Sequence, residues 1–163
     1  MNKKILGIFV TVLALVIFAV PVMAKPTQTP IEYFKEVEEV ISVVGGTAGE
    51  SDVYHIKVSE RRGSIYEGTD STEEKLFTFT QWGSCTMNRK QGRAEWHVYM
   101  IWVSTTADGG FKGKLNGINP VSSVYTVSGV LNGYGELEGQ KLTIEMTRDP
   151  PNSAYITGFL KTP

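Results

Sequence analysis

Three residues in the middle of the chain have the side chains that nucleophilic catalysis needs. Cys85 could act as the nucleophile, His97 as its base and Glu95 as the group that orients the histidine. A hairpin turn between Cys85 and Arg93 would bring them near one another. However, Glu95 and His97 alternate with apolar residues, as the polar face of an ordinary strand does. The pattern therefore favours a structural role, and the three stay candidates without an assigned enzyme activity.

Cys85 is also the only cysteine, so no disulfide can form within the chain. Three roles remain open for it: a small buried apolar side chain, a link to another chain, or a reactive thiol. Free cysteines are among the most buried residue types, which favours the first role.

Four large side chains could instead line a ligand-binding cavity. Trp96, Met100 and Trp102 share one face of residues 93–104, and Trp82 lies on the preceding predicted strand. Large aromatic side chains usually pack in a core. The interior of an eight-stranded barrel, however, is either just filled by side chains or holds one small ligand. The sequence leaves open whether these side chains form a packed core or line a cavity. A cavity would predict a small apolar or aromatic ligand.

Metal and cofactor sites have little support in the sequence. His55 and His97 are the only histidines, and no Cys-x-x-Cys or His-x-His pair is present. The glycines at positions 133, 135 and 139 lack the dinucleotide spacing, and the strand-like residues 141–147 follow them where a helix would be needed. We expect a turn there, no metal and no cofactor.

A third possibility is binding at the surface. Tyr66, Tyr99 and Tyr134 could be exposed and recognise a glycan or another envelope protein. The sequence thus leaves three functions open: a ligand-binding barrel, an interaction module, and an enzyme (a barrel cyclase or a thiol enzyme).

The elements that position these residues follow an alternating pattern typical of strands. Strands are predicted at 51–59, 65–67, 75–82, 93–104, 111–116, 123–131, 141–147 and 154–161. Turn signals occur at Arg62-Gly63, Asp108-Gly109-Gly110 and Asn132-Gly133, and the two prolines within 148–153 exclude a strand interior. The pattern predicts an all-β fold, an antiparallel β-barrel of about eight strands, with a β-sandwich as the alternative. Glycines inside the predicted strands favour the barrel.

The pattern before these strands predicts a short helix. Thr29 could cap it, Pro30 suits its first turn, and apolar residues from Ile31 to Ile41 recur at helical spacing. A β-branched segment, 40–44, then predicts passage into a strand. We therefore expect three regions: 1–24 as a signal peptide, 25–50 as a tether with a short helix or strand, and 51–163 as the β-barrel domain.

The first 24 residues have the pattern of a secretory signal peptide. A basic start precedes the charge-free run 5–20, and Val22-Met23-Ala24 ends in the small-residue pattern of a cleavage site. Secreted or cell-envelope localisation is predicted, with an uncleaved membrane anchor as the alternative. Without Lys3 and Lys4 the chain keeps 14 basic and 17 acidic residues, a net charge of −3, so nucleic acid is not an expected partner.

Glycine-punctuated segments near the C-terminus carry a family resemblance. These segments are Phe111-Lys112-Gly113, the run 130–139 (VLNGYGELEG) and Tyr155-Ile156-Thr157-Gly158. Over about the last third of the chain they resemble small β-barrels of the allene oxide cyclase and dirigent type. The resemblance implies barrel architecture and an apolar lumen. None of the catalytic positions of those families is carried over to this chain.

Overall fold

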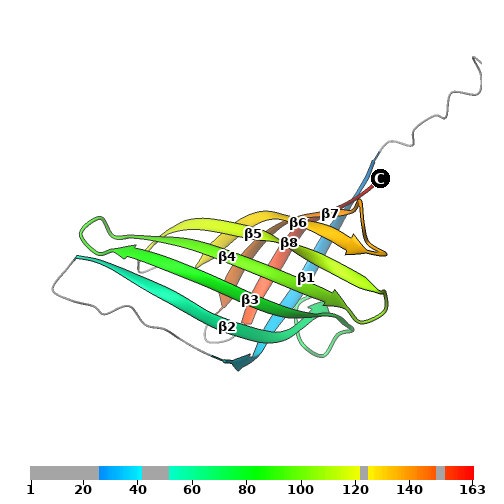
Figure 1. Cartoon of the computed structure of the whole chain (residues 1–163), viewed down its shortest axis with the longest axis horizontal. Helices are drawn as coiled ribbons and strands as arrows, with labels where there is room; N and C mark the ends of the chain where they lie inside the picture. Colours follow the sequence, from blue (N-terminus) through cyan, green and yellow to red (C-terminus); the bar gives the residue numbers. More distant parts are fainter. Residues whose placement is uncertain (1–25, 42–51, 122–124, 150–152) are drawn as a thin grey trace, which may run out of the picture.

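The chain folds into a closed barrel of eight antiparallel strands (Figure 1). This computed structural model describes residues 26–41, 52–121, 125–149 and 153–163. The strands are β1 (Thr27–Val40), β2 (Val53–Glu67), β3 (Lys75–Asn88), β4 (Arg93–Ser104), β5 (Gly109–Pro120), β6 (Thr126–Gly135), β7 (Lys141–Asp149) and β8 (Ser153–Thr162). Each strand pairs with the next along the chain, and β8 pairs with β1. The predicted all-β antiparallel barrel is confirmed, and the sandwich alternative was wrong.

The N-terminal leader stays a prediction. The proposed signal peptide, residues 1–24, lies outside the described residues, as does most of the segment 40–44 that was expected to continue as a strand. Within the described ranges, no helix is long and apolar enough to cross a membrane.

Residues 29–41 do not form the predicted helix. Residues 27–40 are strand β1, whose residues 27–36 pair with β8 and whose residues 33–40 pair with β2. Without β1, the edges of β2 and β8 would be left with unpaired backbone groups, and closing the barrel satisfies them. The barrel therefore begins at Thr27 rather than at residue 51.

The predicted turn at Arg62-Gly63 was also wrong. Both residues lie within β2, a single strand of 15 residues. Its pairing with β3 shifts register between Val58 and Arg61, as at a β-bulge. A bulge bends a strand and increases its twist without ending it. The two short strands expected at 51–59 and 65–67 are thus one element.

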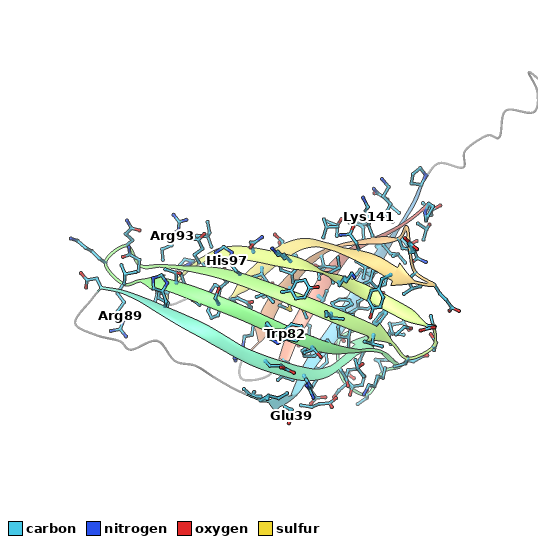
Figure 2. The ribbon with its side chains drawn as sticks, viewed as in Figure 1. Glu39, Trp82, Arg89, Arg93, His97 and Lys141 are labelled. Atoms are coloured by element: carbon cyan, nitrogen blue, oxygen red, sulfur yellow. The ribbon has the colours of Figure 1, made fainter. Side chains whose placement is uncertain are left out.

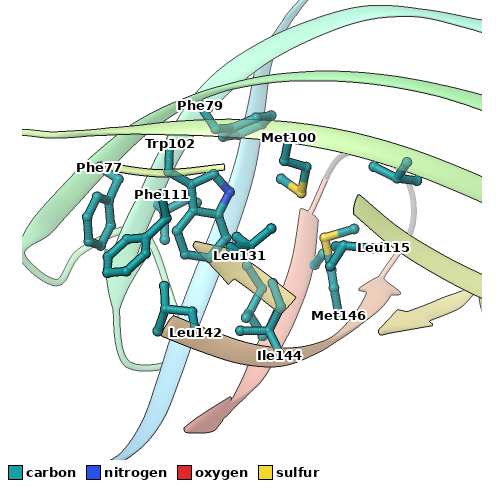
Figure 3. Packing of buried hydrophobic residues seen from close by; sticks show 14 of the residues in the cluster. Phe77, Phe79, Met100, Trp102, Phe111, Leu115, Leu131, Leu142, Ile144 and Met146 are labelled. Carbon is teal, nitrogen blue, oxygen red and sulfur yellow. The ribbon is translucent and has the colours of Figure 1, made fainter. Parts of the chain in front are cut away.

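Alternate residues of all eight strands fill the interior. Buried apolar side chains come from every strand and form one cluster: Val37, Ile65, Phe77, Phe79, Val98, Met100, Trp102, Phe111, Leu115, Val127, Leu131, Leu142, Ile144, Met146, Ala154 and Ile156. Figure 3 shows how members of this cluster pack against one another. This core gives the barrel its stability, since the described chain contains no disulfide.

Glycines allow neighbouring strands to approach closely. A Cβ atom added at Gly129 in β6 would overlap the backbone carbonyl oxygen of Lys114 in β5. Gly139 serves a different purpose, because it adopts a φ of +86° in the turn between β6 and β7. The turn between β6 and β7 therefore falls at residues 136–139. The predicted turn at Asn132-Gly133 was wrong, because both residues lie within β6 and pair with β5.

Candidate functional site

Met100 and Trp102, two of the predicted ligand-contacting residues, belong to the packed part of the interior. Both are fully buried. The Trp102 ring centroid lies 5.6 Å from that of Phe77 and 6.3 Å from that of Tyr33. Figure 3 shows Trp102 and Met100 surrounded by other core side chains. Side chains occupy the space here, so these two residues act as core.

Trp82 lies on the outside of the barrel, away from the other three predicted residues. Its side chain is 36% exposed, and Figure 2 shows it on the outer side of the sheet. Its ring packs against Tyr99, with 6.0 Å between centroids. A shallow groove runs beside this pair and is lined in part by His97 and Asn116. The four predicted residues therefore do not form one site.

Trp96 lies on the inner face of β4, six residues or about 20 Å along the strand from Trp102. Its ring meets the Tyr125 ring edge to face, with 4.4 Å between centroids. Tyr125 is held just before β6, because its carbonyl oxygen accepts a hydrogen bond of 2.8 Å from the backbone N–H of Arg148. Asn119 holds the next residue, Thr126, with two further hydrogen bonds.

These two aromatic rings border a pocket inside the barrel. Its lining comes from β1, β2, β3, β4, β7, β8 and the residue before β6: Lys35, Val37, Arg61, Gln81, Gly83, Trp96, Val98, Tyr125, Met146, Arg148, Ser153 and Ala154. About 440 Å³ of it holds no protein atom, and part of this space opens to solvent. The centre of a water molecule can reach only about 20 Å³. The pocket is therefore narrow, and a larger ligand would have to displace its long side chains.

Lys35 is the most unusual residue of this lumen pocket. It is 4% exposed, and its Nζ donates a hydrogen bond of 2.5 Å to Gln81 Oε1. Nζ also lies 3.8 Å from Met146 Sδ and 4.6 Å from the centre of the Phe79 ring. Burial, together with the charges of two arginines, lowers the pKa of Lys35 to about 7. A neutral amine and an ammonium are therefore both accessible near neutral pH.

Arg61 and Arg148 are the two arginines that face Lys35. Each lowers the pKa of Lys35, and desolvation together with Arg148 also lowers the pKa of Arg61. The Nε atom of Arg61 is buried and has no hydrogen-bond partner among the described residues. Burial raises the pKa of Tyr125 far above its usual range, so its hydroxyl stays protonated as a hydrogen-bond donor. The pocket thus combines three basic side chains with a phenol.

The structure does not bring Cys85, Glu95 and His97 together. Cys85 points inward and is 1% exposed, and burial raises the pKa of its thiol to about 11. Glu95 and His97 lie on the opposite, outer face of β4, 3.6 Å apart, and Figure 2 shows His97 over the outer surface. A thiolate, a base and an orienting group cannot converge from two sides of one sheet. The arrangement offers no nucleophilic site of this composition.

The other histidine takes part in a surface contact. His55 is exposed, and a hydrogen bond of 2.9 Å joins its Nδ1 to Thr86 Oγ1. Among the described residues, no group of three or more His, Cys, Asp or Glu side chains is placed to hold a metal ion.

The sequence reasoning missed the three basic residues because it misassigned their segments. Lys35 was placed in a helix, Arg61 beside a turn and Arg148 in a loop, so none could be given an inward direction. Comparison with models of known protein families and with curated proteins found no match to this chain. The site is therefore interpreted from its own chemistry.

Proposed function

We propose that this protein binds a small molecule in the lumen pocket and is not an enzyme. The observation that carries the proposal is a partly open pocket inside the barrel, bordered by Trp96 and Tyr125. Binding sites of this kind combine apolar and aromatic walls with a few polar groups that fix orientation. Val37, Val98 and Met146 supply apolar wall. The aromatic or apolar part of the ligand is expected to contact these side chains.

The size of the pocket limits the ligand. The space open to water centres, about 20 Å³, is little more than the volume one water molecule requires. A ligand must therefore be small, or must shift the flexible side chains of Lys35 and Arg61 as it enters. Core side chains around Trp102 fill the rest of the lumen. The ligand can therefore occupy only the part of the barrel where the pocket lies.

Tryptophan fluorescence tests the proposal, because only one of the three tryptophans borders the pocket. A small aromatic ligand should produce a saturable change in emission in the unmodified protein. Trp96→Phe should remove most of this change, whereas Trp82→Phe, on the outer face, should leave it. An equal change in both variants would place binding outside the lumen, and no saturable change for any small ligand would count against the proposal.

A second candidate function is surface recognition of a glycan, and one observation favours it. Trp82 and Tyr99 form an exposed aromatic pair whose ring planes are 30° apart, beside a hydrogen bond of 2.8 Å between His97 Nδ1 and Asn116 Oδ1. Sugar rings stack on aromatic faces and hydrogen-bond to neighbouring polar groups. Tyr134 fits less well, because its hydroxyl donates a hydrogen bond to the Trp102 carbonyl oxygen. Binding to a glycan array that survives Trp82→Ala would argue against this surface.

Export completes the proposal and rests on the leader pattern of residues 1–24. Mass spectrometry of the protein from the producing cell should give a chain that begins at Lys25. A chain that retains residues 1–24 would instead support the membrane-anchored alternative. The likeness to allene oxide cyclase and dirigent barrels stays a prediction, and it bears on architecture alone.

A further inference from the structure

The lumen pocket has several basic side chains and, among its described lining residues, no acidic ones. Lys35, Arg61 and Arg148 all line it, and none of the described lining residues carries a carboxylate. Removing a charged group from water is costly unless a partner of opposite charge or several hydrogen bonds compensate. A pocket with basic and no acidic side chains among its described lining residues therefore favours an anionic ligand over a cationic one.

The contacts of Lys35 compensate little of this charge. Its Nζ has a neutral amide oxygen at 2.5 Å, a thioether sulfur at 3.8 Å and an aromatic ring at 4.6 Å. An ammonium has three hydrogen-bond donors, and only the amide oxygen is a strong acceptor among these three contacts. The buried Nε of Arg61, without a partner in the described structure, is a second donor in the same pocket. Both donors suit an anionic acceptor that enters from solvent.

We infer that the ligand of the lumen pocket is a small organic carboxylate. Lys35 and the two arginines would hold its carboxylate group, and Trp96 and Tyr125 would contact its apolar part. This inference rests on the proposed function and adds the charge and class of the ligand. It keeps the aromatic or apolar part that the sequence suggested for the ligand and adds an anionic group to it.

The shape of the donors favours a carboxylate. The planar guanidinium group of an arginine can pair with both oxygens of a carboxylate through two parallel hydrogen bonds. The protonated hydroxyl of Tyr125, coupled electrostatically to Arg61 and Arg148, adds a neutral donor. The narrow space suits a flat group with two acceptor atoms better than a bulkier anion.

Isothermal titration with benzoate and benzyl alcohol tests the charge of the ligand, because the two share a ring and differ in the anionic group. At about pH 6.5, benzoate should bind at least roughly tenfold more tightly than benzyl alcohol, as charge-assisted hydrogen bonds to several donors imply. Lys35→Met and Arg61→Gln should each weaken benzoate binding by roughly tenfold or more and leave benzyl alcohol little changed. Lys161→Met, which removes an exposed lysine of β8, is the matched control and should change neither affinity.

Circular dichroism of each variant checks that the barrel is intact. Two different substitutions are used so that one unfolded variant does not decide the outcome. Equal affinity for benzoate and benzyl alcohol would overturn the carboxylate inference and leave the proposed function standing. Unchanged benzoate affinity in both folded variants would also overturn it. Failure of both compounds to bind would count against the inference and the proposed function together.

Discussion

Lys35 and Gln81 are joined inside the barrel by a hydrogen bond of 2.5 Å from the lysine Nζ to the glutamine Oε1. The two residues come from β1 and β3, which are not neighbours in the sheet because β2 lies between them. The hydrogen bond therefore links, inside the lumen, two strands that do not pair with each other. It places a titratable amine beside two arginines, and the properties of the pocket follow from that position.

Lys35 should make the stability of the barrel depend on pH just above neutrality. Its pKa is about 7 in the folded protein, whereas an unfolded lysine titrates near 10.4. Between these values the unfolded chain binds more protons than the folded one, so the free energy of unfolding rises with pH, by roughly 1 kcal/mol per pH unit. Well below pH 7 both the folded and the unfolded form are protonated and this dependence disappears. Urea denaturation at about pH 6, 7 and 8 measures it.

Lys35→Met is the control for this pH dependence, because it keeps a chain of similar length without the amine. The variant should lack the rise between about pH 7 and pH 8. The phenol of Tyr125, which lines the same pocket, does not titrate in this window, because burial raises its pKa far above it. A rise of the same size in the variant would show that another group is responsible.

Carboxylate binding should also depend on pH, in the opposite direction. At about pH 6 Lys35 is already charged, whereas at about pH 8 only roughly a tenth of the molecules carry the ammonium before binding. The apparent affinity for benzoate should therefore fall by roughly tenfold over this range. Titration calorimetry in two buffers of different ionisation enthalpy should show uptake of close to one proton at about pH 8. Binding without proton uptake would indicate that Lys35 does not contact the carboxylate.

The sequence predicted the barrel well where strands alternate regularly. Residues 93–104 form β4 with the predicted bounds and with Trp96, Met100 and Trp102 on its inner face. It failed for β1, because Thr29, Pro30 and the spacing of apolar residues imitate a helix start. Local propensity favoured a helix there, but pairing with β2 and β8 stabilises the strand.

The same errors concealed the candidate site. A lysine on a supposed helix, or an arginine beside a supposed turn, is expected to point into solvent. Only the correct strand assignment shows that its side chain points into the barrel. The bulge near Arg61 adds a register shift that no two-residue period predicts. Trp82 shows the opposite error. Its residue type suggested a ligand contact, but the alternation of β3 places its side chain on the outer face of the barrel.

Gly129→Ala should destabilise the barrel. A Cβ at this position overlaps the Lys114 carbonyl oxygen and lies 3.0 Å from Leu115 Cδ2, so β5 and β6 must move apart. Overpacking of this kind costs roughly 1 to 3 kcal/mol. Urea denaturation measures the loss, and Ser128→Ala, at the adjacent exposed position, should change stability by less than about 0.5 kcal/mol. Equal stability of the two variants would mean that the strands are not closely apposed at Gly129.

Cys85 should be unreactive in the folded protein. Its side chain is almost fully buried, and desolvation raises the pKa of the thiol to about 11, so the nucleophilic thiolate is scarce at neutral pH. Incubation with a thiol-reactive reagent near pH 8 should give almost no modification in buffer and complete modification in concentrated urea. Mass spectrometry of the intact chain measures both. Rapid modification of the folded protein would restore the thiol-enzyme alternative, because it would require an exposed thiolate that this barrel does not provide.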